Sequence, residues 1–160
     1  MSIHHQDTTR VANAIAKPLN ADIGSPEYIS PQKISDYDLI GFGSGIYFGR
    51  FHSALRLWID ELPDESVQHR KAFVFSTSGL PFLSWLWHRP LKSRLRRKGF
   101  EVIGEFHSSG FDTVGPLRLL GGLNRRHPDE CDLENAAIFA RQLLVLLADS
   151  ESAQPLCPSP

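Results

Sequence analysis

A glycine-rich run directly after an apolar strand is the feature that most constrains the fold of this chain. Residues 38–42 read Asp-Leu-Ile-Gly-Phe, which is typical of a buried strand, and residues 43–49 read Gly-Ser-Gly-Ile-Tyr-Phe-Gly. Glycines permit positive φ angles and close approach of the backbone to a ligand, and the two aromatic rings offer flat faces to a flat ligand. In an open α/β sheet, ligands bind at the carboxyl ends of the strands. A glycine-rich turn with two packed aromatic rings fits the same residues equally well.

Composition narrows the class of protein. The chain has 160 residues, of which 41% are hydrophobic and 22% are charged, as in one ordinary globular domain. A net charge of −1 gives no reason to expect nucleic acid or an anionic membrane as a partner. The two cysteines make no disulfide framework. No apolar stretch approaches ~20 residues, so we expect no transmembrane segment, and no apolar signal region opens the chain. We expect a cytoplasmic protein.

Strand-like and helix-like segments alternate along the chain. The spacing of apolar residues predicts helices at 8–19, 52–62, 91–98 and 132–147, with Asp132 as the cap of the last one. Strands are predicted at 38–42, 71–75 and 100–106, with a short edge strand at 21–23. This order predicts a parallel sheet with helices on both faces. We expect one domain over residues 2–147 and a disordered tail, rich in Ser, Pro and acidic residues, over 148–160.

The small-residue loops resemble those of the flavodoxin-like family, in the group named flavodoxin family protein or flavodoxin domain. Members have a first strand followed by a Ser-x-His-His-Gly-Asn-Thr phosphate loop, and residues 2–8 here read Ser-Ile-His-His-Gln-Asp-Thr. The similarity continues through residues 41–49 and covers most of the chain. It ends with Gly104-Glu105-Phe106, Gly110-Phe111-Asp112-Thr113, Gly115-Pro116, Gly121-Gly122 and His127-Pro128.

The resemblance implies a doubly wound parallel sheet in a three-layer sandwich, with strand order 2-1-3-4-5 and FMN bound at the switch point. The phosphate would lie on the N–H groups of residues 2–8 and the N-terminus of the first helix, which is a sound anion site. Tyr47 would stack on the flavin ring, and residues 76–79 would line its pyrimidine side. The implied cofactor-binding residues are Ser2, His4, His5, Gln6, Asp7, Thr8, Gly43, Ser44, Gly45, Ile46, Tyr47, Phe48, Ser76, Thr77, Ser78 and Gly79.

Two departures from the family pattern matter. The first strand, central in the implied order, is missing from this chain, although a buried central strand contributes on the order of 10 kcal/mol. We therefore expect the native protein to carry further residues in front. In the phosphate loop, Gln6 and Asp7 replace Gly and Asn, and a carboxylate ~4 Å from a phosphate is repelled by ~4 kcal/mol at an effective dielectric near 20. Positive charge on His4 and His5 would offset this repulsion.

Two function classes remain open at this level. One is an FMN-binding redox protein, either an electron carrier or a small FMN-dependent oxidoreductase, that passes electrons to a redox partner protein or a quinone-like acceptor. The other is a truncated or degenerate flavodoxin-like domain that does not bind flavin and is an interaction module or inactive. We predict no metal site, because His127 and Cys131 are four residues apart with Pro128 between them and no further ligands at a suitable spacing. No catalytic residue is predicted.

Overall fold

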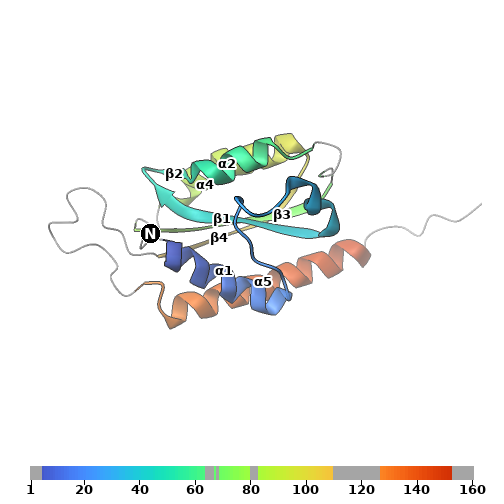
Figure 1. Cartoon of the computed structure of the whole chain (residues 1–160). Helices are drawn as coiled ribbons and strands as arrows, with labels where there is room; N and C mark the ends of the chain where they lie inside the picture. The colour runs from blue at the N-terminus through green and yellow to red at the C-terminus, as the bar shows by residue number, and fades with distance from the viewer. Residues whose placement is uncertain (1–4, 64–66, 68, 80–82, 110–126, 153–160) are drawn as a thin grey trace, which may run out of the picture.

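The computed structural model describes residues 5–63, 67, 69–79, 83–109 and 127–152, and within them a four-stranded sheet lies between two layers of helices (Figure 1). None of the helices in these ranges has the length and apolar character needed to cross a bilayer. The elements are α1 (His5–Leu19), the 3-10 helix η1 (Pro31–Asp36), β1 (Leu39–Tyr47), β2 (Arg50–Phe51), α2 (Ser53–Asp60), β3 (Lys71–Ser78), α4 (Ser84–Lys98), β4 (Glu101–Ser109) and α5 (Glu130–Ser152).

The sheet has the order β2-β1-β3-β4. β3 runs parallel to both of its neighbours, pairing Gly43 of β1 with Phe75 and His107 of β4 with Ser76. β2 is a short antiparallel addition that pairs with the end of β1. The doubly wound α/β fold predicted from the sequence is confirmed, and the strand order is consistent with a flavodoxin-like sheet whose first strand is missing. The predicted edge strand at 21–23 is wrong, because these residues form no strand.

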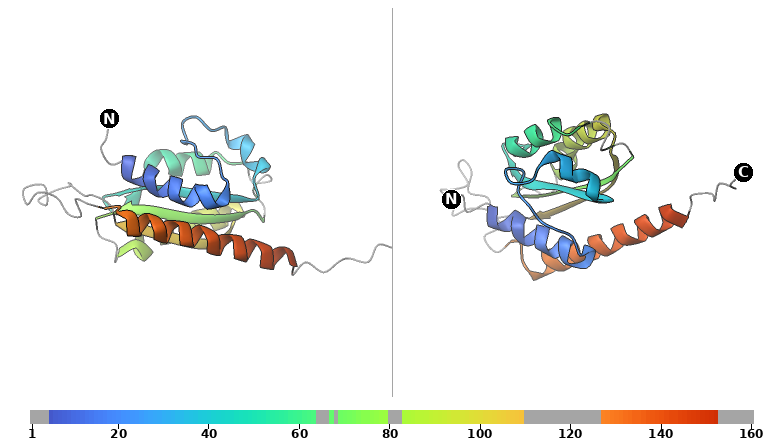
Figure 2. Two further views of the ribbon diagram at one scale, coloured as in Figure 1. Left: turned by 90° about the horizontal axis from the view of Figure 1, so that it is seen from below. Right: turned by 45° about the vertical axis from the view of Figure 1, so that its right-hand side comes forward.

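Two hydrophobic cores lie on opposite faces of the sheet. Side chains alternate along β3, so Ala72 and Val74 join the core under α2 and α4, while Phe73 and Phe75 join the core against α1 and α5. α1 and α5 lie side by side on their face of the sheet, as the two views of Figure 2 show. β3 is therefore covered on both faces, as expected of the central strand of a parallel sheet.

β1 continues through the glycine-rich run, which the sequence analysis interpreted as a loop. Gly43 lies in the strand, and the reason for a glycine is its neighbour in β3: a Cβ built on Gly43 would lie 2.0 Å from the ring of Phe75. Gly41 has the same relation to Phe73, at 2.3 Å. These two glycines thus make room for aromatic rings of this chain. β3 likewise extends through Ser78, beyond its predicted end.

The last helix is longer than predicted at both ends. It begins at Glu130, and its cap is Asp129 rather than Asp132: the Asp129 Oδ1 accepts from the Asp132 amide at 2.9 Å, and the Asp132 Oδ2 accepts from the Asp129 amide at 3.0 Å. The helix runs to Ser152, five residues beyond its predicted end at residue 147. Residues 153–160 lie outside the described ranges.

The packing of Phe75 over Gly43 gives a direct test. We expect Gly43→Ala to lower the free energy of unfolding by about 2–3 kcal/mol, because the methyl group collides with a ring that is held between a strand and a helix. Gly45→Ala is the matched control in the same strand, since its Cβ would meet only the flexible Tyr47 side chain, with the hydroxyl at 3.2 Å. Urea unfolding of both variants measures the difference, and equal losses would contradict the packing argument.

Candidate functional site

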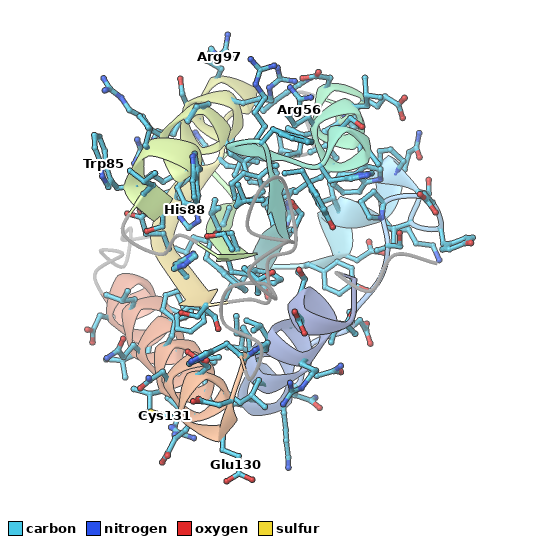
Figure 3. The ribbon with its side chains drawn as sticks, turned by 90° about the vertical axis from the view of Figure 1, so that its left-hand side faces the viewer. Arg56, Trp85, His88, Arg97, Glu130 and Cys131 are labelled. Carbon is cyan, nitrogen blue, oxygen red and sulfur yellow. The ribbon has the colours of Figure 1, made fainter. Side chains whose placement is uncertain are left out.

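The carboxyl ends of β1, β3 and β4 lie at one edge of the sheet, and α1 begins at this carboxyl edge. Thr8 in the first turns of α1 shares a hydrogen bond of 2.7 Å with Thr77 near the end of β3. This bond fixes the start of the helix against the central strand. Figure 3 views the molecule from this side, with His88 between α4 and the sheet. The carboxyl edge is where ligands bind in open α/β sheets.

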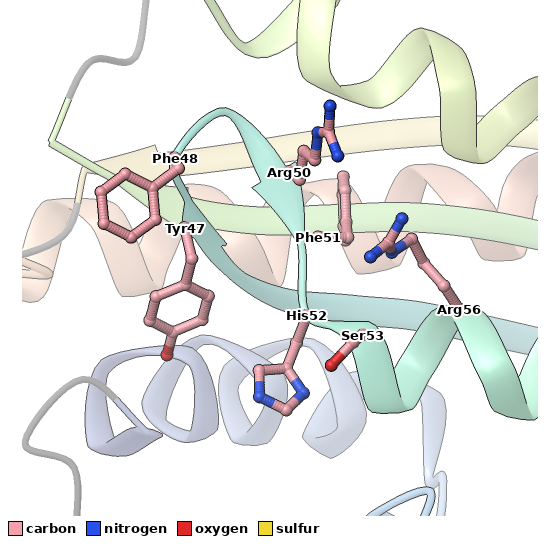
Figure 4. A pocket seen from close by; sticks show the side chains of 7 residues that line it. All are labelled: Tyr47, Phe48, Arg50, Phe51, His52, Ser53 and Arg56. Atoms are coloured by element: carbon pink, nitrogen blue, oxygen red, sulfur yellow. The ribbon is translucent and has the colours of Figure 1, made fainter.

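The turn between β1 and β2 presents an aromatic ring at this edge. Phe48 has a φ of 50° and Gly49 a φ of 74°, so both adopt the left-handed conformation, and the Phe48 side chain is 88% exposed. Tyr47 is half-buried, and burial raises the pKa of its phenol. The hairpin borders a hollow of about 450 Å³ (Figure 4). Its lining residues are Tyr47, Phe48, Arg50, Phe51, His52, Ser53 and Arg56.

Several predicted site residues are engaged in contacts within the chain. The Ser44 hydroxyl donates to the Gly45 carbonyl at 2.7 Å and accepts from the His52 amide at 3.1 Å. Gly43, Ser44, Gly45, Ile46 and Tyr47 are strand residues of β1, and Gly79 follows β3. Phe48, in the turn, projects into solvent, whereas Tyr47, the stacking residue that the resemblance implies, is half-buried.

The predicted phosphate loop is described only from its end. Asp7 and Thr8 lie in the first turns of α1, which is the predicted place for a helix start at the carboxyl edge. Ser2 and His4 lie outside the described residues. His5 and Gln6 belong to α1, and their side chains are not described. The assignment of these residues to a phosphate therefore stays a prediction.

A chain of polar side chains runs beneath the carboxyl edge, on the face covered by α4, and Ser76 is its only member among the residues that the resemblance implied for the site. The Ser76 Oγ lies 2.7 Å from the His88 Nε2 and 3.1 Å from the His107 Nδ1. The His88 Nδ1 lies 3.1 Å from the Glu105 Oε2. The same oxygen forms an ion pair with the Lys92 ammonium at 2.8 Å. Ser76 and His88 are fully buried, whereas Glu105 is 42% exposed. The chain therefore leads from solvent to the interior.

The electrostatics of this network favour neutral histidines beside an ionised carboxylate. Burial lowers the pKa of His88, against the opposing effect of Glu105. Burial and the nearby His88 lower the pKa of His107 to about 4. Burial alone raises the pKa of Glu105, but the hydrogen bond and charge of Lys92, together with His88, bring it below the usual value. At neutral pH the network carries one carboxylate and one ammonium, and both imidazoles are uncharged.

Two buried polar atoms at the carboxyl edge have no hydrogen-bond partner among the described residues: the Ser78 Oγ and the His107 Nε2. A buried polar atom without a partner costs about 1–3 kcal/mol. Ser78 lies two residues beyond Ser76 in β3, so both side chains are on the face that carries His107. A ligand that offers both a hydrogen-bond donor and an acceptor would satisfy these two atoms. A planar heterocycle with such an edge also suits the exposed ring of Phe48, so these residues fit a flavin.

A second polar cluster lies at the N-terminus of α5. One ligand-type atom from each of His127, Asp129 and Asp132 lies within 4.8 Å of the others. The His127 Nδ1 is 2.5 Å from the Asp132 Oδ2, and this hydrogen bond raises the pKa of His127. The two carboxylates already accept backbone amides as the helix cap described above, so the cluster has a structural explanation. Cys131, the other residue considered for a metal, is exposed.

The sequence carries a signal for one residue of the polar network. His88, Leu91 and Leu95 are spaced three and four residues apart, and all three are buried on one face of α4. His88 therefore belongs to the buried stripe of α4. Glu105 and His107 alternate with Phe106 in β4, which places them on the face of α4. That these side chains meet at Ser76 can be predicted only when the register of the sheet is known.

Comparison with known proteins identifies the fold class first. An archaeal flavodoxin has a solved structure with a TM-score of 0.65 to this chain at 15% sequence identity, covering 92% of this chain and 94% of that one. General stress protein 14 of Treponema denticola, solved in complex with FMN, has a TM-score of 0.52 at 15% identity, covering 90% and 91%. The fold is flavodoxin-like, as the resemblance implied. No family model matches the chain.

The chain belongs to the same family as the uncharacterized protein MJ0298 of Methanocaldococcus jannaschii. The two are 48% identical over 143 residues, which cover 89% of this chain and 93% of that protein. The similarity extends over almost the whole of both sequences.

The buried histidines predict a fall in stability on acidification. The unfolded chain protonates its histidines near pH 6.5, whereas His107 has a pKa of about 4 in the folded state, so unfolding takes up a proton between these values. We expect the free energy of unfolding to fall by about 2–3 kcal/mol from pH 6.5 to 4 on account of His107.

Urea unfolding across this pH range measures the effect in the wild type and in His107→Gln. The variant should show a shallower dependence on pH, because it has no imidazole to titrate. His69→Asn is the control, since His69 is exposed and asparagine tolerates its φ of 62°. An unchanged slope in His107→Gln would contradict the assignment.

Proposed function

We propose that this protein binds FMN at the carboxyl edge of its sheet and transfers electrons through it. The observation that carries the proposal is the presence, at one edge, of three features that suit a flavin. These are an exposed aromatic ring at Phe48, the start of α1 fixed by the bond between Thr8 and Thr77, and two buried polar atoms without partners, on Ser78 and His107. The shared fold with an FMN-bound structure supports it.

The chain offers distinct groups to distinct parts of the cofactor. The first turns of α1 would hold the phosphate through backbone N–H groups and the helix dipole. The Thr8 hydroxyl already bonds Thr77, so its contribution would come from the backbone. Phe48 rather than Tyr47 would stack on the ring, because Phe48 is 88% exposed and Tyr47 is half-buried. Ser78 and His107 would bond its polar edge.

When bound, FMN supplies one- and two-electron chemistry, and the protein supplies binding, orientation and exclusion of water. We propose a redox partner protein or a quinone-like molecule as the electron acceptor. If the protein is an enzyme, it is an FMN-dependent oxidoreductase. The cytoplasmic location stays a prediction.

Titration of FMN with the purified protein tests the proposal. We expect shifted flavin absorption bands and quenched flavin fluorescence, because the ring leaves water and contacts aromatic and peptide groups. An unchanged spectrum of free FMN at high protein concentration would contradict the proposal and favour a flavodoxin-like domain that does not bind flavin. Riboflavin, which lacks the phosphate, separates ring binding from phosphate binding: weaker binding of riboflavin supports the anion site at α1.

The stacking role of Phe48 has a matched control in the same chain. Phe48→Asn removes the ring while asparagine tolerates the φ of 50° at this turn. We expect FMN to bind about three- to tenfold more weakly, which corresponds to the loss of one aromatic contact. Tyr28→Asn is the control, since Tyr28 is 87% exposed and belongs to the segment between α1 and η1. Equal Kd values for Phe48→Asn and the wild type in fluorescence titrations would exclude Phe48 from the site.

A further inference from the structure

We propose that Glu105, His88, Ser76 and His107 form a proton relay that ends at the Nε2 atom of His107 and connects the ligand site at the carboxyl edge with solvent. The proposal rests on the FMN function above, because the reduction of a flavin changes the protons on its ring. All hydrogen bonds of the relay join described residues of this chain. Its inner end, the Nε2 atom of His107, has no partner among them.

The direction of each hydrogen bond in the relay follows from donor and acceptor chemistry. A carboxylate only accepts, so the bond at 3.1 Å to Glu105 requires the proton of neutral His88 on Nδ1. The Nε2 of His88 is then an acceptor and takes the Ser76 hydroxyl proton at 2.7 Å. Since that hydroxyl has one proton, the Ser76 Oγ accepts from the Nδ1–H of His107 at 3.1 Å. The Nε2 of His107 is left with a lone pair.

This lone pair is buried and finds no partner among the described residues. His107 lies two residues before the end of β4 at Ser109, opposite Ser76, and the Ser78 hydroxyl nearby is also buried without a partner among the described residues. A structural staple between β3, β4 and α4 would need only the bonds among Ser76, His88 and Glu105. The additional atoms point to a group that the described residues do not supply and that offers a donor to His107.

Proton movement through these residues balances without another reactant. When the Nε2 of His107 takes a proton from a bound group, its Nδ1 proton passes to Ser76, and the hydroxyl proton of Ser76 passes to the Nε2 of His88. The His107 ring and the Ser76 hydroxyl each lose one N–H or O–H bond and gain another. His88 gains one N–H bond, so the positive charge ends on His88 beside the Glu105 carboxylate. The reverse sequence returns a proton to the bound group. Glu105 is 42% exposed, so solvent can exchange protons at the outer end.

The charged groups around the relay favour this end point. Lys92 of α4 lies 2.8 Å from Glu105 and keeps the carboxylate ionised, while it opposes a positive charge on His88. Asp132 of α5 favours a positive charge on His107, and His88 opposes it. Within the described part of the chain, Glu105 is the one carboxylate among these groups that accepts a hydrogen bond from a relay imidazole, that of His88. The excess proton is therefore best placed on His88.

The test begins with histidine tautomers in the protein without FMN, read from long-range ¹⁵N–¹H NMR spectra at pH 7.5. We expect both His88 and His107 as the neutral tautomer with the proton on Nδ1. Ser76→Ala removes the acceptor for the Nδ1 proton of His107 and should shift His107 toward the Nε2–H form, and Ser76→Thr should restore the wild-type spectrum. Ser108→Ala is the matched control, because Ser108 is a buried serine of β4 that bonds the Ser109 carbonyl outside the relay. An Nε2–H tautomer of His107 in the wild type would overturn the relay even if no variant folds.

The second arm adds FMN and separates the relay from the proposed function. We expect FMN to shift the Nε2 resonance of His107 in the wild type, and His107→Phe to weaken FMN binding about three- to tenfold, as for the loss of one hydrogen bond. If FMN binds and this resonance does not move, the proposed function stands and the relay to the ligand is wrong. If FMN does not bind at all, the proposed function fails, and with it the ligand end of the relay, whatever the tautomers are.

Discussion

β3 is the strand on which the structure depends, because it is paired on both edges and covered on both faces. Every residue from Ala72 to Ser78 is buried. Its first half satisfies this environment with Ala, Phe and Val side chains that enter the two cores. Its last three residues are hydroxyl-bearing, and each buried hydroxyl requires a partner. The position of those partners determines what else lies at the carboxyl edge of the sheet.

The partners come from three different elements, which is why the carboxyl edge is organised around β3. Thr77 bonds Thr8 of α1 on one face, and Ser76 bonds His88 of α4 and His107 of β4 on the other. Ser78 has no partner among the described residues. The polar end of a buried strand thus aligns the start of α1, fixes one face of α4 and leaves one hydroxyl available. A ligand at this edge would complete a set of hydrogen bonds that the protein has already arranged.

The sequence allowed the fold to be predicted better than the site. Helices and strands followed from the spacing of apolar residues, and the loops resembled those of the correct fold. The glycine run misled the interpretation, since Gly43 was interpreted as part of a ligand loop, whereas it makes room for Phe75 of the neighbouring strand, as Gly41 does for Phe73. That pairing depends on register, which a single strand does not reveal. For the same reason the meeting of Ser76, His88 and His107, separated by 12 and 31 residues from the serine, was beyond prediction.

The outer edge of β1 has a consequence for how this molecule meets other chains. Within the described residues, strand pairing on that side involves only Ile46 and Tyr47, through β2. The amides and carbonyls of alternate residues between Leu39 and Gly45 bond β3, and those of the residues between them face outward. These outward groups form a template to which an extended segment can add by backbone hydrogen bonds alone. Because Gly41, Gly43 and Gly45 have no side chains, this edge presents less apolar surface than the strand edges that aggregate into fibrils. Recruitment of a further strand would thus be governed by the shape of the backbone and would tolerate wide variation in the sequence of the incoming segment.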